Sequence, residues 1–386
     1  MRSGLLRKLS LMEQGQKQTV THKPEPPQSK LKIYEWSCPA NEGLKSLNRD
    51  ALLTMGFTGE RFDIEKAVFL DTETNGLSGG AGTVAFLVGV GFVSNGRFTV
   101  KQYLMPDYSV ETDLLSELGR DMSRFETIVH FNGRRFDVPL LSQRCVMKRM
   151  DDFTKDMWQL DLLYPSRSVW KLRLGCCRLS YLESHVLGMP DRDDIPGSEI
   201  PARYMQSVRS GDVSLLSDVV EHNRQDIATL MTLLVRLNEI YTEPEELNEQ
   251  IDIFSMGRVF ERQGEYRVAR KLYLKASKPR PIMTLSDLRG EKYAGEANLR
   301  LYLIQRRARE YDKCEQTLKN MLKRGQMGET PRLELCKLYE HRLGRLDDAL
   351  EQCLLLISKA SDDELPELEK RRNRILYKIS RRVGNQ

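Results

Sequence analysis

Short runs of apolar residues alternate with polar turns over residues 67–163 of this 386-residue chain. Short runs that are rich in Val, Phe, Tyr and Thr are typical of buried strands, because these side chains pack well on a pleated surface. Ser94-Asn95-Gly96 separates two such runs and is typical of a hairpin turn. The runs predict five strands, at residues 67–70, 83–93, 97–105, 127–132 and 158–163.

Between and after these strands, apolar positions recur at the spacing that marks one face of a helix. They predict helices at residues 110–123, 137–149, 180–188 and 219–234. Residues 191–201 are acidic and contain two prolines and a glycine, so we expect a surface loop there. Hairpin strands followed by alternating strands and helices predict an α/β fold, in which helices flank a mixed sheet.

From Pro244 onward the pattern is entirely helical. Segments 264–276, 309–322 and 344–357 align on Tyr266, Tyr311 and Leu346, with spacings of 45 and 35 residues that bracket the tetratricopeptide period of about 34. Three helical hairpins of this kind stack into a short solenoid, which usually binds proteins or peptides. The alternative is a purely structural cap. A second anchor position holds small residues that let paired helices pack closely: Ala269, Cys314 and Ala349.

These patterns divide the chain into three parts. Residues 1–30 hold little to bury and end in KPEPPQSK, so we expect a flexible N-terminal tail. Residues 31–66 contain enough large apolar side chains to wrap around the following domain. We therefore predict an α/β domain over residues 31–243 and an all-α, tetratricopeptide-like (TPR-like) domain over residues 244–386.

Charge is distributed unevenly along the chain, although the net charge is only +5. Residues 1–250 carry 30 Lys and Arg against 35 Asp and Glu, whereas residues 251–386 carry 30 against 20. A basic C-terminal part suits contact with a polyanion or an acidic protein. The alternative is a solvated helical face.

Cysteine spacing and hydropathy exclude several classes of protein. None of the seven cysteines forms a Cys-x-x-Cys pair, which argues against a zinc site. An odd number of cysteines without a secretory leader predicts reduced thiols in the cytosol. No apolar run approaches about 18 residues, so we expect no membrane span.

Paired acids end the first predicted strand, in the order Asp71-Thr72-Glu73. Alternation along a strand places both carboxylates on one face and Thr72 on the other. Two neighbouring acids repel each other, and a hard cation such as Mg²⁺ or Mn²⁺ relieves that repulsion. The alternative is a strand that simply ends in a polar turn.

Two later segments add candidate groups. Asp137 follows an Asn132-Gly133 turn and begins a predicted helix, where its alternative role is that of an N-cap. His222 and Asp226 are four residues apart on a predicted helix and therefore share one face. Their alternative role is that of a solvated surface pair.

The three segments DTETNGL, FNGRRFDVPLL and EHNRQDIATL, in this order, resemble the exonuclease motifs of the DnaQ-like branch of the ribonuclease H-like superfamily. From about residue 31 onward, the chain looks like the bacterial YprB family, also called mitomycin repair factor B. The resemblance implies a ribonuclease H-like fold. One departure concerns the third motif, in which His222 stands four residues before Asp226, where many relatives have tyrosine at that spacing or histidine at five.

By this resemblance, Asp71, Glu73, Asp137 and Asp226 bind two Mg²⁺ or Mn²⁺ ions and His222 acts as the general base. It implies a two-metal 3′→5′ exonuclease on DNA, cytoplasmic and nucleoid-associated, acting in DNA repair with a helicase or another protein bound to the TPR-like tail. A ribonuclease with the same site stays open, because nothing in the motifs reads a 2′-hydroxyl. A TPR-like binding scaffold with an inactive nuclease site is the third alternative.

Overall fold

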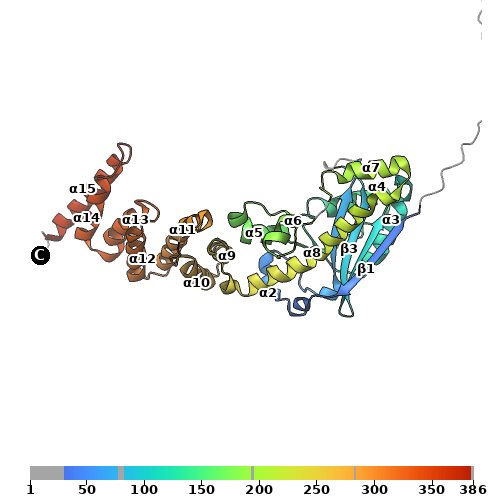
Figure 1. Cartoon of the computed structure of the whole chain (residues 1–386). Helices are drawn as coiled ribbons and strands as arrows, with labels where there is room; N and C mark the ends of the chain where they lie inside the picture. Colours follow the sequence, from blue (N-terminus) through green and yellow to red (C-terminus); the bar gives the residue numbers. More distant parts are fainter. Residues whose placement is uncertain (1–29, 77–81, 193–194, 282–283, 384–386) are drawn as a thin grey trace, which may run out of the picture.

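The computed structural model describes residues 30–76, 82–192, 195–281 and 284–383. The predicted flexible tail therefore lies outside the described residues, except for Lys30. The first half of the chain contains a six-stranded sheet in the order β1-β4-β3-β2-β5-β6. Figure 1 shows this sheet flanked by helices. Its first four strands in this order are antiparallel, β5 pairs parallel to β2, and β6 pairs parallel to β5. The strands are β1 Lys32–Pro39, β2 Ala67–Thr74, β3 Ala85–Ser94, β4 Arg97–Leu104, β5 Thr127–His130 and β6 Trp158–Asp161.

The predicted α/β fold with a mixed sheet is confirmed, and the strands extend the prediction at two places. β2 continues through the acids to Thr74, where the pattern predicted a strand only to Leu70. The segment expected to wrap around the domain begins with β1, an edge strand paired with β4. Most side chains of β1 are exposed. An edge strand that buries neither face leaves no clear apolar alternation in the sequence.

Helices cover the sheet, and four of them match predicted helices: α3, α4, α6 and α8. The helices of this half are α2 Arg49–Met55, α3 Glu111–Met122, α4 Asp137–Met147, α5 Leu163–Leu174, α6 Leu179–His185, α7 Ile200–Ser210 and α8 Ser217–Thr242. Short 3₁₀ turns lie at Glu42–Ser46, Ile64–Lys66, Tyr108–Val110, Val213–Leu216 and Pro244–Glu246. α5 and α7 were not predicted, and α7 begins at the end of the segment expected to be a loop.

Helix α8 lies close to the sheet because β3 carries glycine where the two elements meet. A Cβ atom at Gly89 would come within 2.2 Å of Asn223 Oδ1, and one at Gly91 within 2.5 Å of Ile227 Cγ2. Only glycine permits an approach this close. The first turns of α8 therefore reach the end of β2, the strand paired with β3.

The C-terminal half is all helical and runs away from the sheet in one direction, which makes the molecule elongated (Figure 1). Its helices are α9 Gln250–Arg262, α10 Tyr266–Ala276, α11 Leu285–Arg307, α12 Tyr311–Lys323, α13 Thr330–Leu338, α14 Leu346–Ile357 and α15 Leu365–Val383, with a π-helical turn at Tyr339–Leu343. The three aligned segments correspond to α10, α12 and α14. Their small anchors, Ala269, Cys314 and Ala349, are all completely buried. The TPR-like assignment stays a prediction.

One apolar core continues across the predicted domain boundary at residue 243. It includes Phe69 of β2, Trp170 of α5, Phe254 of α9 and Leu301 of α11. An ion pair between Arg173 Nε and Asp252 Oδ2, 2.8 Å apart, also joins α5 to α9. A separate core holds the later helices, from α12 to α15. The boundary therefore stays a prediction, and the first tail helices share their core with the sheet.

Among the described residues, no helix is both long enough and apolar enough to cross a membrane.

Candidate functional site

The two acids at the end of β2 face α8. Asp71 and Glu73 continue the alternate positions of Ala67 and Phe69, which pack in the core shared with α8. Asp71 Oδ2 accepts a 2.8 Å hydrogen bond from Asn223 Nδ2. Glu73 Oε1 lies 3.6 Å from His222 Nε2. Both contacts come from the first turns of α8, so the helix positions the strand acids directly.

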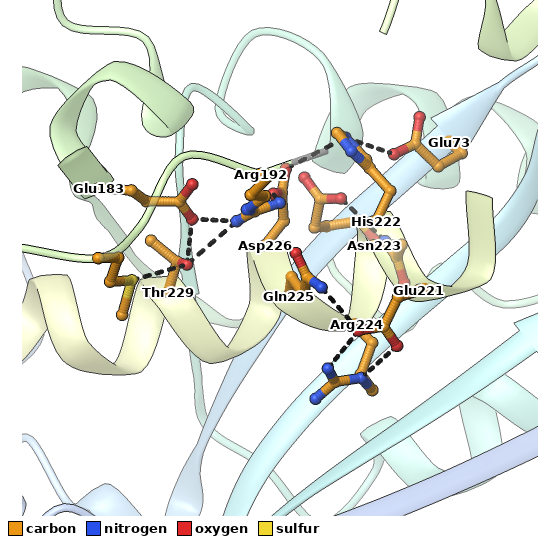
Figure 2. Close-up of polar contacts among 12 residues, drawn as sticks. Glu73, Glu183, Arg192, Glu221, His222, Asn223, Arg224, Gln225, Asp226 and Thr229 are labelled. Carbon is orange, nitrogen blue, oxygen red and sulfur yellow. Dashed lines mark hydrogen bonds and ion pairs between the residues drawn. The ribbon is translucent and has the colours of Figure 1, made fainter. Parts of the chain in front are cut away.

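His222 links an acid of the strand to an acid of its own helix. Its Nε2 atom lies 3.6 Å from Glu73 Oε1 and also 3.6 Å from Asp226 Oδ2, one helical turn later (Figure 2). The three side chains keep 14–18% of their surface exposed. The imidazole is therefore reachable by a small solute, and it borders two carboxylates.

Asp137 approaches the same place from the other face of β2. It is the first residue of α4 and is buried. Its Oδ1 atom accepts a 2.5 Å hydrogen bond from the Thr72 hydroxyl. Burial raises the pKa of Asp137 to about 6, although the hydrogen bond from Thr72 acts in the opposite direction. Thr72 thus connects Asp137 to the strand that carries the other two acids.

The four predicted acids influence one another electrostatically. Burial raises the pKa of Asp71 well above its usual value, and the negative charges of Asp226, Glu73 and Asp137 raise it further. The hydrogen bond from Asn223 lowers it only in part. The structure therefore gathers all four acids around the end of β2, where their charges repel.

An arginine and a fifth acid, neither of them predicted, complete the site. Arg192 Nη1 lies 2.6 Å from Asp226 Oδ1, and Arg192 Nη2 pairs with Glu183 of α6 (Figure 2). Thr229 of α8 donates to Glu183 and accepts from Arg192 at 3.2 Å. A lone basic residue in an acidic segment is the only local signal for Arg192, and we interpreted that segment as a surface loop.

The donor chemistry of the site fits a hard divalent cation. The acids offer carboxylate oxygens, which Mg²⁺ and Mn²⁺ prefer, and their repulsion favours a positive charge between them. Within the described ranges, however, no three His, Cys, Asp or Glu side chains are already arranged to hold a metal ion. In this arrangement Arg192 supplies positive charge to Asp226.

Comparisons with known proteins agree with this geometry. A family model for the RNase H superfamily matches residues 68–238, which include all five predicted site residues. The uncharacterized protein YprB of Bacillus subtilis (strain 168) is 32% identical over 195 residues. That match covers 50% of this chain and 47% of the relative, so the chain spans about half the length of that protein. Residues 68–238 are therefore similar to the RNase H superfamily, and half of the chain is similar to YprB.

Proposed function

We propose that this protein is a divalent-metal-dependent 3′→5′ exonuclease that hydrolyses the phosphodiester bonds of DNA. The observation that carries the proposal is the gathering of Asp71, Glu73, Asp137 and Asp226 at the end of β2, with His222 between two of them. Members of the RNase H superfamily are usually nucleases, and the segment that matches this superfamily, residues 68–238, contains all five of these residues.

The four acids are the proposed ligands of two Mg²⁺ or Mn²⁺ ions. When bound, the ions would supply positive charge to the phosphate in the transition state and acidity to the attacking water. His222 is the proposed general base, because an imidazole changes its protonation near neutral pH and its Nε2 atom faces Glu73 and Asp226. Asn223 orients Asp71 through its side-chain amide, and Thr72 orients Asp137 through its hydroxyl.

The substrate and partners follow from the resemblance to the YprB family. DNA is the proposed substrate and DNA repair the proposed role, with a helicase or another protein as partner of the TPR-like tail. The C-terminal part carries ten more Lys and Arg than Asp and Glu, which supports contact with nucleic acid or with an acidic protein.

The direct test uses the purified full chain on single- and double-stranded DNA and RNA, labelled at either end, with Mg²⁺, Mn²⁺ or EDTA. We expect DNA to shorten from the 3′ end with either metal ion and to stay intact in EDTA. Asp71→Asn and Asp226→Asn should each slow cleavage roughly 100-fold or more, because each removes a charge that the cations need. Asp113→Asn, on an exposed position of α3, is the matched control and should cleave normally.

Each other outcome assigns a different function. Cleavage of RNA alone would make the protein a ribonuclease with the same site. Full activity in EDTA would contradict metal dependence. No cleavage of any substrate would leave a binding scaffold.

A further inference from the structure

Among the described residues, two basic side chains form ion pairs with the four proposed metal ligands. One is His222, and the other is Arg192. Its guanidinium lies between Asp226 of α8 and Glu183 of α6, and it bonds to Thr229 as well (Figure 2). The Arg192 side chain is 14% exposed and Glu183 only 3%. The contact is therefore built into the interior edge of the site and is not a surface ion pair.

The chemistry of arginine suits this position. A guanidinium presents several N–H donors in a planar fork, so one side chain can hold two carboxylates at once. Here one nitrogen serves Asp226 and the other serves Glu183 and Thr229. This arrangement places one positive charge beside Asp226, whose negative charge acts on Asp71.

We propose that Arg192 is a built-in cation that competes with a divalent metal ion for Asp226. Asp226 Oδ1 bonds to Arg192, and Oδ2 faces His222 at 3.6 Å. A metal ion bound to Asp226 must then either share the carboxylate with the Arg192 guanidinium or displace that guanidinium. Like charges repel strongly in a partly buried site, so binding of the ion and the Arg192–Asp226 contact oppose each other. The inference rests on the proposed metal-dependent function.

The structure also offers Arg192 a place once Asp226 is released. Glu183 and Thr229 hold the second nitrogen of the guanidinium independently of Asp226. Beside them lies a cleft of about 480 Å³, lined by Arg192, Glu183, Thr229 and residues of the preceding turns of α8. Arg192 can therefore keep its contact with Glu183 while its other nitrogen turns away from Asp226. Arg192 would thus stabilise the metal-free acids and release Asp226 when the ion binds.

Calorimetric titration of Mn²⁺ alone into the metal-stripped full chain tests this inference. We expect Arg192→Gln to bind Mn²⁺ about tenfold more tightly than the wild type, a coupling of the usual size between two sites. The double variant Arg192→Gln/Glu183→Gln should show a similar gain, because the guanidinium is removed without leaving an unpaired buried acid. Arg224→Gln is the matched control and should bind like the wild type. Arg224 lines the same cleft but pairs with Glu221 and stacks on Trp36.

Thermal unfolding gives a second measurement that does not depend on cleavage. In EDTA, Arg192→Gln should unfold at a lower temperature than the wild type, because the acids lose their internal cation. Added Mn²⁺ should raise the unfolding temperature of Arg192→Gln by more than that of the wild type, since stabilisation by a ligand grows with its affinity.

Equal Mn²⁺ affinity in the wild type and Arg192→Gln would overturn the inference and leave the nuclease proposal intact. Weaker binding by Arg192→Gln would also overturn it, because Arg192 would then support the metal site. A gain that disappears in the double variant would assign the effect to Glu183, again against the inference. No Mn²⁺ binding by any variant would overturn both this inference and the proposed metal dependence.

Discussion

His222, the proposed general base, lies between an acid of the strand and an acid of its own helix. Its Nε2 atom lies 3.6 Å from one acid of β2 and 3.6 Å from one acid of α8. Asn223, the next residue, instead points its amide at Asp71. Adjacent positions on the first turns of α8 therefore face different acids: Asn223 contacts Asp71, and His222, the proposed general base, lies between Glu73 and Asp226.

We predict that His222→Ala slows cleavage at neutral pH by about 10²–10⁴-fold, the usual contribution of a positioned base. Mn²⁺ affinity should change little, and part of the rate should return at higher pH, where hydroxide replaces the missing base. His222→Tyr should keep more activity than His222→Ala. Single-turnover rates against pH, together with metal titrations, check this. Cleavage by His222→Ala at the wild-type rate, or a loss explained by failed metal binding alone, would contradict the role.

At the scale of elements, the site depends on how closely α8 lies against β3. Gly89 pairs with Asp71 across the sheet, and its missing side chain leaves room for Asn223. A Cβ atom there would sit 2.2 Å from Asn223 Oδ1 and 3.0 Å from its Cγ atom. Asn223 is completely buried and also accepts a hydrogen bond from Gln102. It therefore has little room to move away.

Gly89→Ala should destabilise the protein by about 1–3 kcal/mol, the usual cost of overpacking a core. It should also weaken the Asn223–Asp71 hydrogen bond and slow metal-dependent cleavage. Denaturant unfolding and cleavage rates measure the two effects. Gly197→Ala is the control, because nothing lies within 4 Å of a Cβ atom there. If both variants were as stable as the wild type, the close approach of α8 would not constrain this position.

One buried acid, Glu340, pairs with several cations of helix α15, which also packs into the apolar core of the tail through Ile375. The Glu340 side chain is completely buried and forms ion pairs with Arg371, Arg374 and Lys378 of α15. Burial by itself would raise the pKa of Glu340, but the hydrogen bonds from Arg374 and Lys378 outweigh it and lower the pKa to about 2. A lowered pKa means that the folded protein favours the charged carboxylate.

The stabilisation by Glu340 should therefore be complete above the usual pKa of 4.5 and should fade as the pH falls toward about 2. At pH 7, Glu340→Gln should cost up to about 3 kcal/mol, because it removes the buried carboxylate whose pKa is lowered from 4.5 to about 2 by its partly exposed cationic partners. The difference between the variant and the wild type should shrink between pH 4.5 and 2. Thermal unfolding at several pH values measures it. Glu367→Gln, which removes an exposed ion pair with Lys370, should have little effect at any pH. A constant difference across this range would contradict the titration of Glu340.

At the scale of the whole molecule, the sheet and the tail share one apolar core. Trp170 of α5 and Tyr241 of α8 belong to the same cluster as Phe254 of α9. The later helices pack around a core of their own, which includes Leu318 and Ile375. The cores therefore change within α11, well after the predicted boundary at residue 243.

A chain that ends at Thr242 should lose stability and expose apolar surface, because α9 to α11 no longer cover α5 and α8. A chain that ends at Arg309 keeps those helices and should unfold close to the temperature of the full chain. Thermal unfolding and binding of a hydrophobic dye compare the two. If the shorter chain were as stable as the longer one, the boundary at residue 243 would separate two independent domains.

Local pattern was sufficient to predict the strands β2 to β6, the helices α3, α4, α6 and α8, and the α/β fold. It also placed Asp71 and Glu73 on one face of a strand and His222 and Asp226 on one face of a helix. The choice of Asp137, and the joint role of all five residues, came from the resemblance to the DnaQ-like exonuclease motifs. The faces of a strand or a helix depend only on neighbouring residues, so the sequence alone is enough to recognise them. β1 was missed because its exposed side chains carry no apolar alternation.

Only the tertiary structure decided which distant residues support the acids. Asn223 is 152 residues from Asp71, and Arg192 is 34 residues from Asp226. Neither contact has a period or a spacing that a sequence could reveal. Each exists because folding brings a buried charge within reach of a donor, and a buried charge must be paired. The shared core also depends on the tertiary structure, because the apolar surface of α5 and α8 is removed from water only where α9 covers it.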